Sequence, residues 1–326
     1  MSATLGSSLA SWSARLNGFA DPGSPDALLS LLRLLYAAGR EDLPLGRLFE
    51  GHVDALQIVA RYGTSGQAAA AAAAAAGGGL FGVWNADLAD ERLRLDHMRL
   101  DGGKSFASGA GLLSHALVTV DAAGERQLIL VDLTRLPPRI DTGWWRTTGM
   151  ARSETHRVAW HDAPIAPADL IGRPGDYVRE PWFSGGALRF AAVQAGGIAA
   201  IVDQARAHLV ATGRAGDPHQ SARLASLYGM AQAASDAVRA AAIAWFDAPD
   251  AHKLALVSAA RVAVYEAADA AMTIAQQAVG VQGMFLDHPL SRTLTDLAVY
   301  IRQPGPDAQR MRVGAAVADG MLSPRL

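Results

Sequence analysis

The chain has 326 residues, half of them hydrophobic and 18% charged, so it can bury large cores and disorder over most of its length is not expected. Its formal net charge of −2 gives no electrostatic reason to expect a nucleic-acid partner. The sequence contains no cysteine, which excludes disulfides, thiolate metal sites and cysteine nucleophiles and fits a reducing compartment.

Neither a signal peptide nor a membrane span is predicted. The stretch from Met1 to Asn17 lacks a basic start and a sustained apolar run. The nearest approach to a membrane span, Gln67–Trp84, contains nine consecutive alanines, which are weakly hydrophobic, and the glycines of residues 77–79 that follow them would break it. We therefore expect a cytoplasmic protein without membrane contact.

Residues 25–76 are predicted to be helical. The leucines between Leu28 and Leu35 form one apolar face, and Pro25 suits the first turn of a helix. A second helix is expected over residues 48–62. The alanine run of residues 68–76 has the highest helix propensity available, and the glycines of residues 77–79 are expected to end it.

Residues 80–172 change to short alternating segments with turn residues between them. Asp101–Gly103 is predicted to form a hairpin turn. Because there is no helical period here, we expect a small antiparallel β domain. The expected strands comprise residues 93–95, 98–100, 115–120, 127–133 and 155–161.

Residues 184–320 return to long apolar helices, expected over residues 190–210, 221–246 and 251–279. Their small residues at close spacing predict tightly packed antiparallel helices, in the simplest case a four-helix bundle. The predicted fold is therefore α+β. It comprises an N-terminal helical domain (1–79), a middle β-barrel-like antiparallel domain (80–175) and a C-terminal helical bundle (176–326).

Common catalytic motifs are missing. The sequence has no dinucleotide-binding or phosphate-binding glycine motif and no Gly-x-Ser-x-Gly. Its nine histidines are scattered, so no metal site is predicted.

Three segments taken together are more informative than these motifs. They are Asp101–Ala110 (DGGKSFASGA), Gly149–Thr155 (GMARSET) with the following VAW and APIAP, and Gln277–Gly283 (QAVGVQG) with Pro289, Arg292 and Asp296. In this order they resemble three motifs of the acyl-CoA dehydrogenase superfamily, over roughly residues 80–320. The resemblance implies that family's order of β domain and helical bundle, a bound FAD, and a homodimer or homotetramer.

Carried over by position, the resemblance also implies cofactor-binding residues. A hydroxyl beside the flavin N5 or O4 stabilises reduced flavin by a hydrogen bond, and glycines let backbone N–H groups approach a phosphate. Taken singly, each position also has a plain structural explanation: Phe106 as core, Ser108 as a strand end, Gly280 as a helix C-cap. The implied flavin contacts are Trp84 and Asn85 in place of the family's first-strand loop, Phe106, Ser108 and Ser153, and Gln277, Gly280 and Gly283 toward a neighbouring subunit's flavin.

The chain departs from the family at the catalytic base. Dehydrogenation of an acyl thioester needs a carboxylate that removes the α proton. Of the two positions at which the family holds this glutamate, Pro304 stands at one and Leu188 at the other. Asp307 is near in sequence, and a surface position is its simplest explanation. The N-terminal helical domain is also shorter than in the family.

Three functions stay open on these grounds. The first is an FAD-dependent oxidoreductase that acts on an acyl thioester such as acyl-CoA, or on a related small molecule, with an unconventional base. The second is a monooxygenase of the same fold that uses reduced flavin and O₂ and needs no glutamate. The third is a noncatalytic homologue that keeps the fold.

Overall fold

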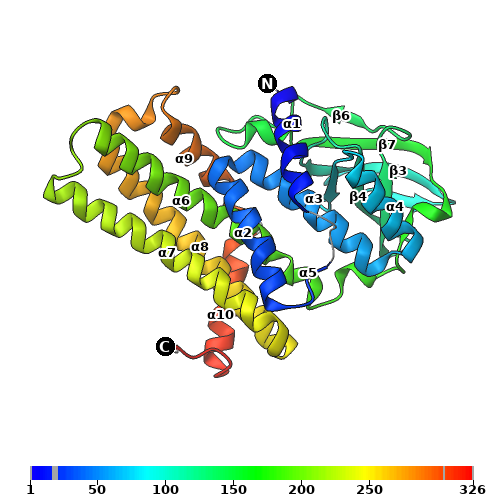
Figure 1. Ribbon diagram of the computed structural model, residues 1–326. Coiled ribbons are helices and arrows are strands. Elements are labelled where there is room, and N and C mark those ends of the chain that lie inside the picture. The colour runs from blue at the N-terminus through cyan, green and yellow to red at the C-terminus, as the bar shows by residue number, and fades with distance from the viewer. Residues whose placement is uncertain (1, 17–20, 304, 325–326) are drawn as a thin grey trace. The chain divides into compact units, whose positions relative to one another are not determined.

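The computed structural model describes residues 2–16, 21–303 and 305–324, with the elements shown in Figure 1. The chain forms two compact units. The first comprises residues 1–21, 47–146 and 151–183, and the second comprises residues 22–46, 147–150 and 184–326. This division follows contacts between segments, whereas the three domains above follow the sequence pattern and stay a prediction.

The helices predicted within residues 25–76 form, but the second begins at Leu43 and not at residue 48, and the helical segments Ser2–Ser13 and Ala14–Leu16 were not predicted. Ser24 caps the first predicted helix through its hydroxyl, which accepts from the Ala27 N–H, and Thr64 forms a reciprocal capping box with Gln67 before the alanine run. Gly77 follows the last residue of that run, as expected. The helices are α1 (Ser2–Ser13), η1 (Ala14–Leu16), α2 (Pro25–Glu41), α3 (Leu43–Tyr62) and α4 (Ser65–Ala76).

Eight strands form one sheet in the first unit, within the range predicted for strands. Their order is β6-β7-β3-β2-β4-β5-β8, with β1 paired to β4. The prediction of a purely antiparallel sheet is wrong, because β1 runs parallel to β4. The strands are β1 (Phe81–Trp84), β2 (Arg94–Asp96), β3 (Arg99–Ala107), β4 (His115–Ala122), β5 (Glu125–Asp132), β6 (Arg139–Asp141), β7 (His156–Pro164) and β8 (Leu170–Ile171).

Both faces of the central strands are buried. Leu117 and Leu128 face a cluster that includes the α3 residues Leu56 and Val59. On the other face, residues of β4, β5 and β7 pack around Trp84 and Trp160. The alternation of β4 and β5 therefore places α3 and α4 over one face and a second apolar core on the other.

The predicted hairpin turn is displaced along the chain. His97 and Met98, both with positive φ, connect β2 to β3, whereas residues 101–103 lie inside β3. Gly102 (φ 104°) marks a register shift of β3 against β7, and a Cβ there would lie 2.4 Å from the Arg92 carbonyl oxygen. Gly102 therefore lies at a β-bulge and allows the backbone of residue 92 to approach closely.

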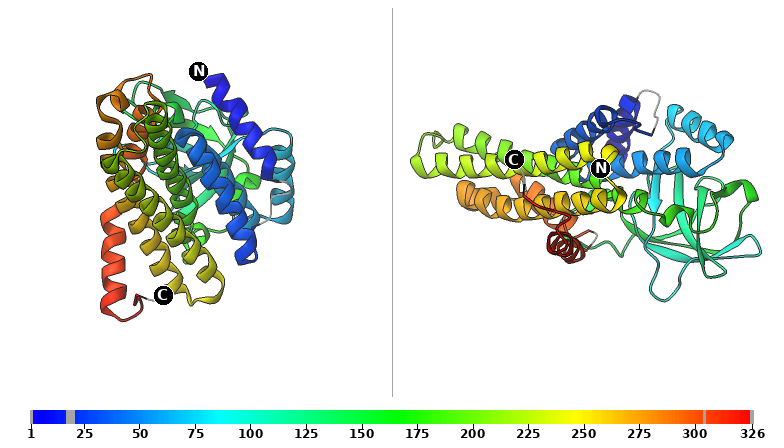
Figure 2. Two further views of the ribbon diagram at one scale, coloured as in Figure 1. Left: turned by 60° about the vertical axis from the view of Figure 1, so that its left-hand side comes forward. Right: turned by 90° about the horizontal axis from the view of Figure 1, so that it is seen from below.

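Long helices dominate the second unit. Figure 2 shows α6, α7 and α8 running beside one another. The N-terminal helix α2 also packs against α6, where Gly39 and Gly196 have no room for a Cβ. The remaining helices of the chain are η2 (Ala151–Ser153), η3 (Pro167–Asp169), η4 (Asp176–Val178), α5 (Trp182–Gly185), α6 (Ala187–Ala211), α7 (Pro218–Asp247), α8 (Asp250–Val279), η5 (Gly280–Met284), α9 (Pro289–Tyr300) and α10 (Pro306–Ala318).

A short internal segment, Thr147–Met150, belongs to this helical unit although the residues on either side of it belong to the first unit. A Cβ on Gly149 would lie 1.9 Å from the Thr295 carbonyl oxygen of α9. The N–H of Met150 donates to the Asp296 carboxylate. The segment is therefore fastened to α9 by a close backbone approach and a charge-assisted hydrogen bond.

In the described part of the chain, residues 182–211 form the one helical stretch whose length and composition would allow a membrane span. Most of its apolar window is buried inside the fold, as in the core helix of a folded domain.

Candidate functional site

The end of β3 carries an exposed aromatic residue, Phe106, and a serine, Ser108, two positions later. Phe106 has a left-handed backbone (φ 52°), and the Ser108 N–H closes a tight turn by donating to the Phe106 carbonyl oxygen at 2.9 Å. Phe106 is 45% exposed, so the explanation of this residue as part of the core does not hold. A non-glycine residue in this strained conformation with an exposed aromatic ring is typical of a functional position.

A chain of three hydroxyls leads to Ser108. Ser153 and Thr155 are buried and share a hydrogen bond of 2.7 Å, and Thr155 Oγ1 donates to Ser108 Oγ at 3.0 Å. The backbone reinforces the arrangement, because the Gly109 N–H donates to the Ser153 carbonyl oxygen at 2.9 Å. No acceptor for the hydroxyl proton of Ser108 is found in the described part of the chain. This proton is therefore available to a ligand.

Two tryptophans that the sequence analysis did not single out complete the aromatic group. Trp144 and Trp145 meet the Phe106 ring edge-on, with centroid distances of 4.9 and 6.1 Å. The Arg157 guanidinium lies 5.0 Å from the Trp144 ring centroid. They lie in the loop after β6, where the sequence has no helical or strand periodicity. The only feature of the sequence that could have indicated them is a pair of tryptophans among polar residues.

Trp84 and Asn85 lie at the end of β1. The Trp84 indole N–H donates to the Ser108 carbonyl oxygen at 3.0 Å, and this hydrogen bond holds β1 to the turn formed by residues 106–108. Asn85 Nδ2 donates to the Tyr177 hydroxyl at 2.6 Å, whereas its Oδ1 is buried and has no partner among the described residues. The structure thus brings Trp84 and Ser108, two of the predicted flavin contacts, next to each other, and the sequence did not indicate Tyr177.

A buried lysine holds the backbone behind Asn85. Lys104 Nζ donates to the Asn85 carbonyl oxygen at 3.2 Å, to Thr119 Oγ1 at 3.0 Å and to the Asp87 carboxylate at 2.5 Å. Burial lowers the pKa of Lys104 to about 8, although the Asp87 carboxylate opposes this shift. Lys104 is therefore a positioning residue for the end of β1.

The two family positions for the catalytic base differ in what the structure describes. Leu188 is a buried leucine at the start of α6, and Pro304 lies outside the described residues. Among the described carboxylates, only Glu50 and Asp296 are buried. Asp296 accepts from the Met150 backbone, and Glu50 forms an ion pair of 2.5 Å with Arg47 on α3.

The remaining predicted positions lie in the second unit. Gly280 (φ 77°, ψ −158°) ends α8 in a conformation that favours glycine, so the structural explanation as a C-cap holds for it. A Cβ on Gly283 would lie 2.9 Å from Val279, which explains that glycine by packing, while Gln277 is exposed. Around them, Val281, Phe285 and Leu286 are exposed apolar side chains, Leu286 at 94%.

The Ser108 region fits a flavin ring by its donor and acceptor set. An isoalloxazine ring presents acceptors at N5 and O4 and a donor at N3. The free Ser108 hydroxyl proton and the unpartnered Asn85 Oδ1 supply one group of each kind, and Phe106 supplies an exposed apolar face. The residues present therefore fit the cofactor that the sequence resemblance implies.

No protein-family model matches the chain, and no curated protein sequence matches it. Solved structures do. The dibenzothiophene monooxygenase TdsC from Paenibacillus sp. A11-2, solved with FMN and indole, matches with a TM-score of 0.79 and 15% identity over 90% of this chain and 84% of that chain. The methanesulfinate monooxygenase MsuC from Pseudomonas fluorescens matches with a TM-score of 0.79 and 15% identity, over 92% and 85% of the two chains.

KijD3, solved with FMN and a dTDP-linked amino-keto sugar, matches with a TM-score of 0.76 and 20% identity, over 91% of this chain and 80% of that chain. These proteins have the acyl-CoA dehydrogenase fold. The chain therefore has this fold, and the resemblance seen in its sequence is confirmed at the level of the fold.

Proposed function

We propose that this chain, with its acyl-CoA dehydrogenase fold, is a monooxygenase that uses reduced flavin and O₂. The observation that carries the proposal is the Ser153–Thr155–Ser108 hydroxyl chain, in which the Ser108 hydroxyl proton has no acceptor among the described residues, together with the exposed aromatic ring of Phe106 two residues earlier. The matched structures support the second of the three functions over the first, since TdsC and MsuC are named monooxygenases. FMN is the proposed cofactor in place of FAD, because TdsC and KijD3 were solved with FMN.

Each residue near Ser108 has a defined part in this proposal. Ser108 would hold the flavin by donating its hydroxyl proton, and Thr155 occupies an Oγ lone pair of Ser108 and so restricts the direction of that donation. Asn85 Oδ1 would be an acceptor for a flavin N–H, and Lys104 holds the strand end that carries Asn85. Phe106 with Trp144 forms an aromatic wall that excludes water. When bound, reduced flavin would supply two electrons and two protons to O₂, and the substrate would supply the other two electrons as it takes up one oxygen atom while the second oxygen leaves as water.

The replaced base supports this reaction class over dehydrogenation. A positioned general base contributes about 10²–10⁴-fold to a proton abstraction. Leucine at position 188 and proline at position 304 have no group that accepts a proton. Oxygen insertion by reduced flavin does not require the removal of a carbon-bound proton, so these replacements leave it possible.

The experiment has a binding stage and a turnover stage. The protein is titrated with FMN and FAD in oxidised and reduced forms, and then supplied with NADH, a flavin reductase and ¹⁸O₂ in the presence of indole, dibenzothiophene or methanesulfinate. Incorporation of one ¹⁸O atom, detected by mass spectrometry, is the expected result. Rapid anaerobic bleaching of bound flavin by acyl-CoA without oxygen incorporation would instead show a dehydrogenase and refute the proposal.

A matched pair of variants locates the flavin. Ser108→Ala is expected to weaken reduced-flavin binding by about 2- to 10-fold, the equivalent of one hydrogen bond. Ser226→Ala, in which the lost hydroxyl donates only to the Ala222 carbonyl oxygen of its own helix, is the control and should bind like the parent. Equal flavin affinity in all three proteins would place the cofactor elsewhere.

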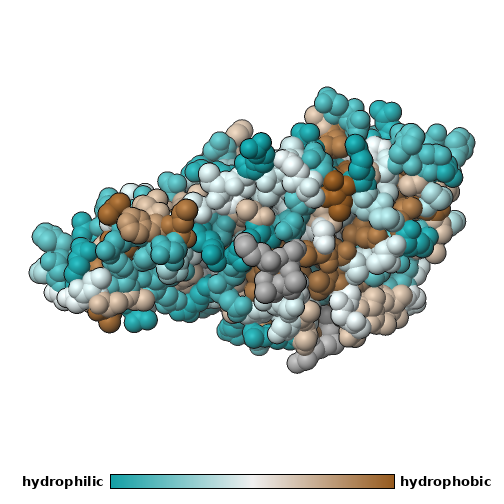
Figure 3. Space-filling model, turned by 90° about the horizontal axis from the view of Figure 1, so that it is seen from above, coloured by the Kyte–Doolittle hydropathy of each residue, from teal (hydrophilic) through white to brown (hydrophobic). Residues whose placement is uncertain are grey.

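We also propose that the chain forms a homo-oligomer through the turn after α8. Figure 3 shows hydrophobic side chains at the surface of the left-hand end of the view, the end where this turn lies in Figure 1. Val281, Phe285 and Leu286 contribute exposed apolar area there. Leu286→Glu should lower the mass measured by analytical ultracentrifugation, whereas Met311→Glu on α10 should not. A monomeric parent at micromolar concentration would contradict this.

A further inference from the structure

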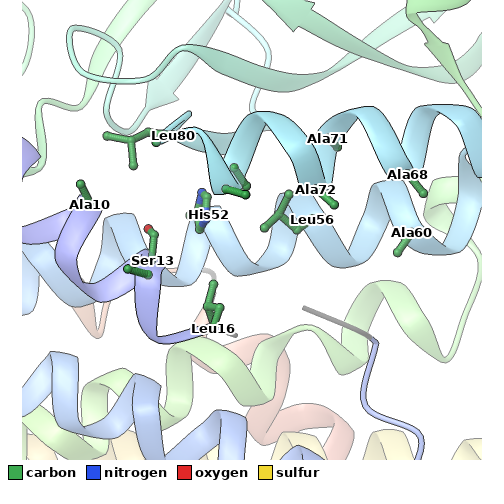
Figure 4. A pocket seen from close by; sticks show the side chains of 14 residues that line it. Ala10, Ser13, Leu16, His52, Leu56, Ala60, Ala68, Ala71, Ala72 and Leu80 are labelled. Carbon is green, nitrogen blue, oxygen red and sulfur yellow. The ribbon is translucent and has the colours of Figure 1, made fainter. Parts of the chain in front are cut away.

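A cavity of about 480 Å³ lies between α1, α3 and α4 in the first unit, and Figure 4 shows the side chains around it. On the α4 side the lining consists of alanines at spacings of three and four residues, which places them on one helix face: Ala68, Ala71, Ala72, Ala75 and Ala76. Leu56 and Ala60 line the α3 side. The methyl groups of the alanine face leave the space that leucines would fill in an ordinary helix contact.

The lining is apolar apart from two side chains. Among the described residues that form it, none carries a permanent charge. The Ser13 hydroxyl donates to the Leu9 carbonyl oxygen within α1 at 2.9 Å, so its proton is engaged. The other polar group is His52, which is 1% exposed and points into the space between the helices (Figure 4).

The hydrogen bonding of His52 defines which of its nitrogens is a donor. Nδ1 accepts from the Phe81 N–H at 3.1 Å, so the neutral ring carries its proton on Nε2. Burial lowers the pKa of His52 to about 4, and the ring is therefore neutral at pH 7. Nδ1 makes the only hydrogen bond of the ring to a described residue, which leaves Nε2–H of this buried side chain as a donor at the apolar cavity.

We propose that this cavity is a second small-molecule site, which binds a neutral, largely apolar molecule whose carbonyl or ring-nitrogen acceptor takes the hydrogen bond of His52 Nε2–H. The volume lies within the roughly 300–1,000 Å³ of ligand pockets, and such pockets combine apolar walls with few polar groups. A charged ligand would lose its hydration without gaining a counter-ion here. His52 is hydrogen-bonded to the first residue of β1, the strand that ends at Trp84 just before Asn85, so the ligand would contact a side chain that is itself bonded to the strand carrying the proposed flavin contacts.

The first test fills the cavity. The FMN-saturated protein is titrated with the neutral ketone dye 6-propionyl-2-(dimethylamino)naphthalene, whose fluorescence reports an apolar surrounding. Ala72→Phe places a ring in the cavity and should weaken binding at least 10-fold. Ala73→Phe, which is exposed like Ala72 but lies outside the lining, is the matched control and should bind like the parent.

The second test addresses the hydrogen bond. 2-Acetylnaphthalene and 2-isopropenylnaphthalene have nearly the same shape, and only the first carries an acceptor. In the parent the ketone should displace the dye about 2- to 10-fold more effectively, as expected for one buried hydrogen bond. His52→Asn keeps an acceptor for the Phe81 N–H but lacks the donor at the Nε2 position, and there the two competitors should be equal.

Two outcomes would overturn the proposal. If the dye does not bind the parent saturably while Ala72→Phe melts at a higher temperature, the cavity is a packing gap and not a ligand site. If Ala72→Phe and the parent bind the dye equally, the dye occupies another place and the assignment of this cavity is wrong. Because FMN is present throughout, neither outcome depends on whether the chain is a monooxygenase.

Discussion

Lowering the pH from 7 to 4 is expected to destabilise the protein through His52. The folded chain holds this ring neutral with a pKa of about 4, whereas an unfolded histidine has a pKa of 6.5. Between these two values unfolding takes up a proton, so stability that is present above pH 6.5 is lost as the pH falls toward 4. With these two pKa values the loss is about 2 kcal/mol at pH 5 and about 3 kcal/mol at pH 4.

Urea unfolding at several pH values, followed by circular dichroism, measures this loss. Other groups titrate in the same range, among them His115, which stacks on the far side of Phe81 at a centroid distance of 4.6 Å and whose pKa burial also lowers. The informative quantity is therefore the difference between the parent and His52→Asn, which keeps the Phe81 hydrogen bond but does not titrate. If this difference stayed constant from pH 7 to pH 4, the account of a buried neutral His52 would be refuted.

Three further predictions concern the site and its support. Gly149→Ala should destabilise the fold by more than about 2 kcal/mol, because the new Cβ would overlap the Thr295 carbonyl oxygen; thermal melting equal to the parent would contradict the close approach. Thr155→Val should weaken reduced-flavin binding and coupled oxygen uptake by about 2- to 10-fold, whereas an unchanged oxygen electrode trace would separate the hydroxyl chain from turnover. Relative to Lys104→Met, the parent should gain about 2 kcal/mol between pH 7 and pH 10, since the folded pKa of Lys104 lies below that of the unfolded chain and unfolding takes up a proton there; urea titrations with a falling difference would disprove this.

The elements were predictable from sequence because each depends on local pattern. The helix caps, the alanine run of residues 68–76 and the alternation of β4 and β5 are properties of neighbouring residues. The turn between β2 and β3 was misplaced because His97 and Met98, not a glycine, adopt the left-handed conformation there. The sequence has no glycine at that turn, and the turn was instead predicted at Gly102 and Gly103, which follow it in the chain.

The candidate site was predictable only where a family motif covers it. Phe106, Ser108 and Ser153 lie in such motifs, and the structure joins Ser108 to Ser153 through Thr155. Trp144 belongs to no motif, and its contact with Phe106 depends on how the loop after β6 folds back. Contacts between residues so far apart in the chain have no local pattern, which is why sequence reasoning missed them.

The fastening of residues 147–150 to α9 has a consequence during synthesis. The Met150 N–H and its acceptor Asp296 are 146 residues apart. At roughly 5–20 residues per second, a ribosome needs about 7–30 s to make the intervening chain. For most of that time the strands on both sides of this segment have already been synthesised, whereas its partner helix α9 does not yet exist. The backbone of Gly149 and Met150 in the nascent chain is therefore without its contacts to α9 for this whole interval. A protease or chaperone that binds exposed backbone could act on these residues before the last helices emerge from the ribosome.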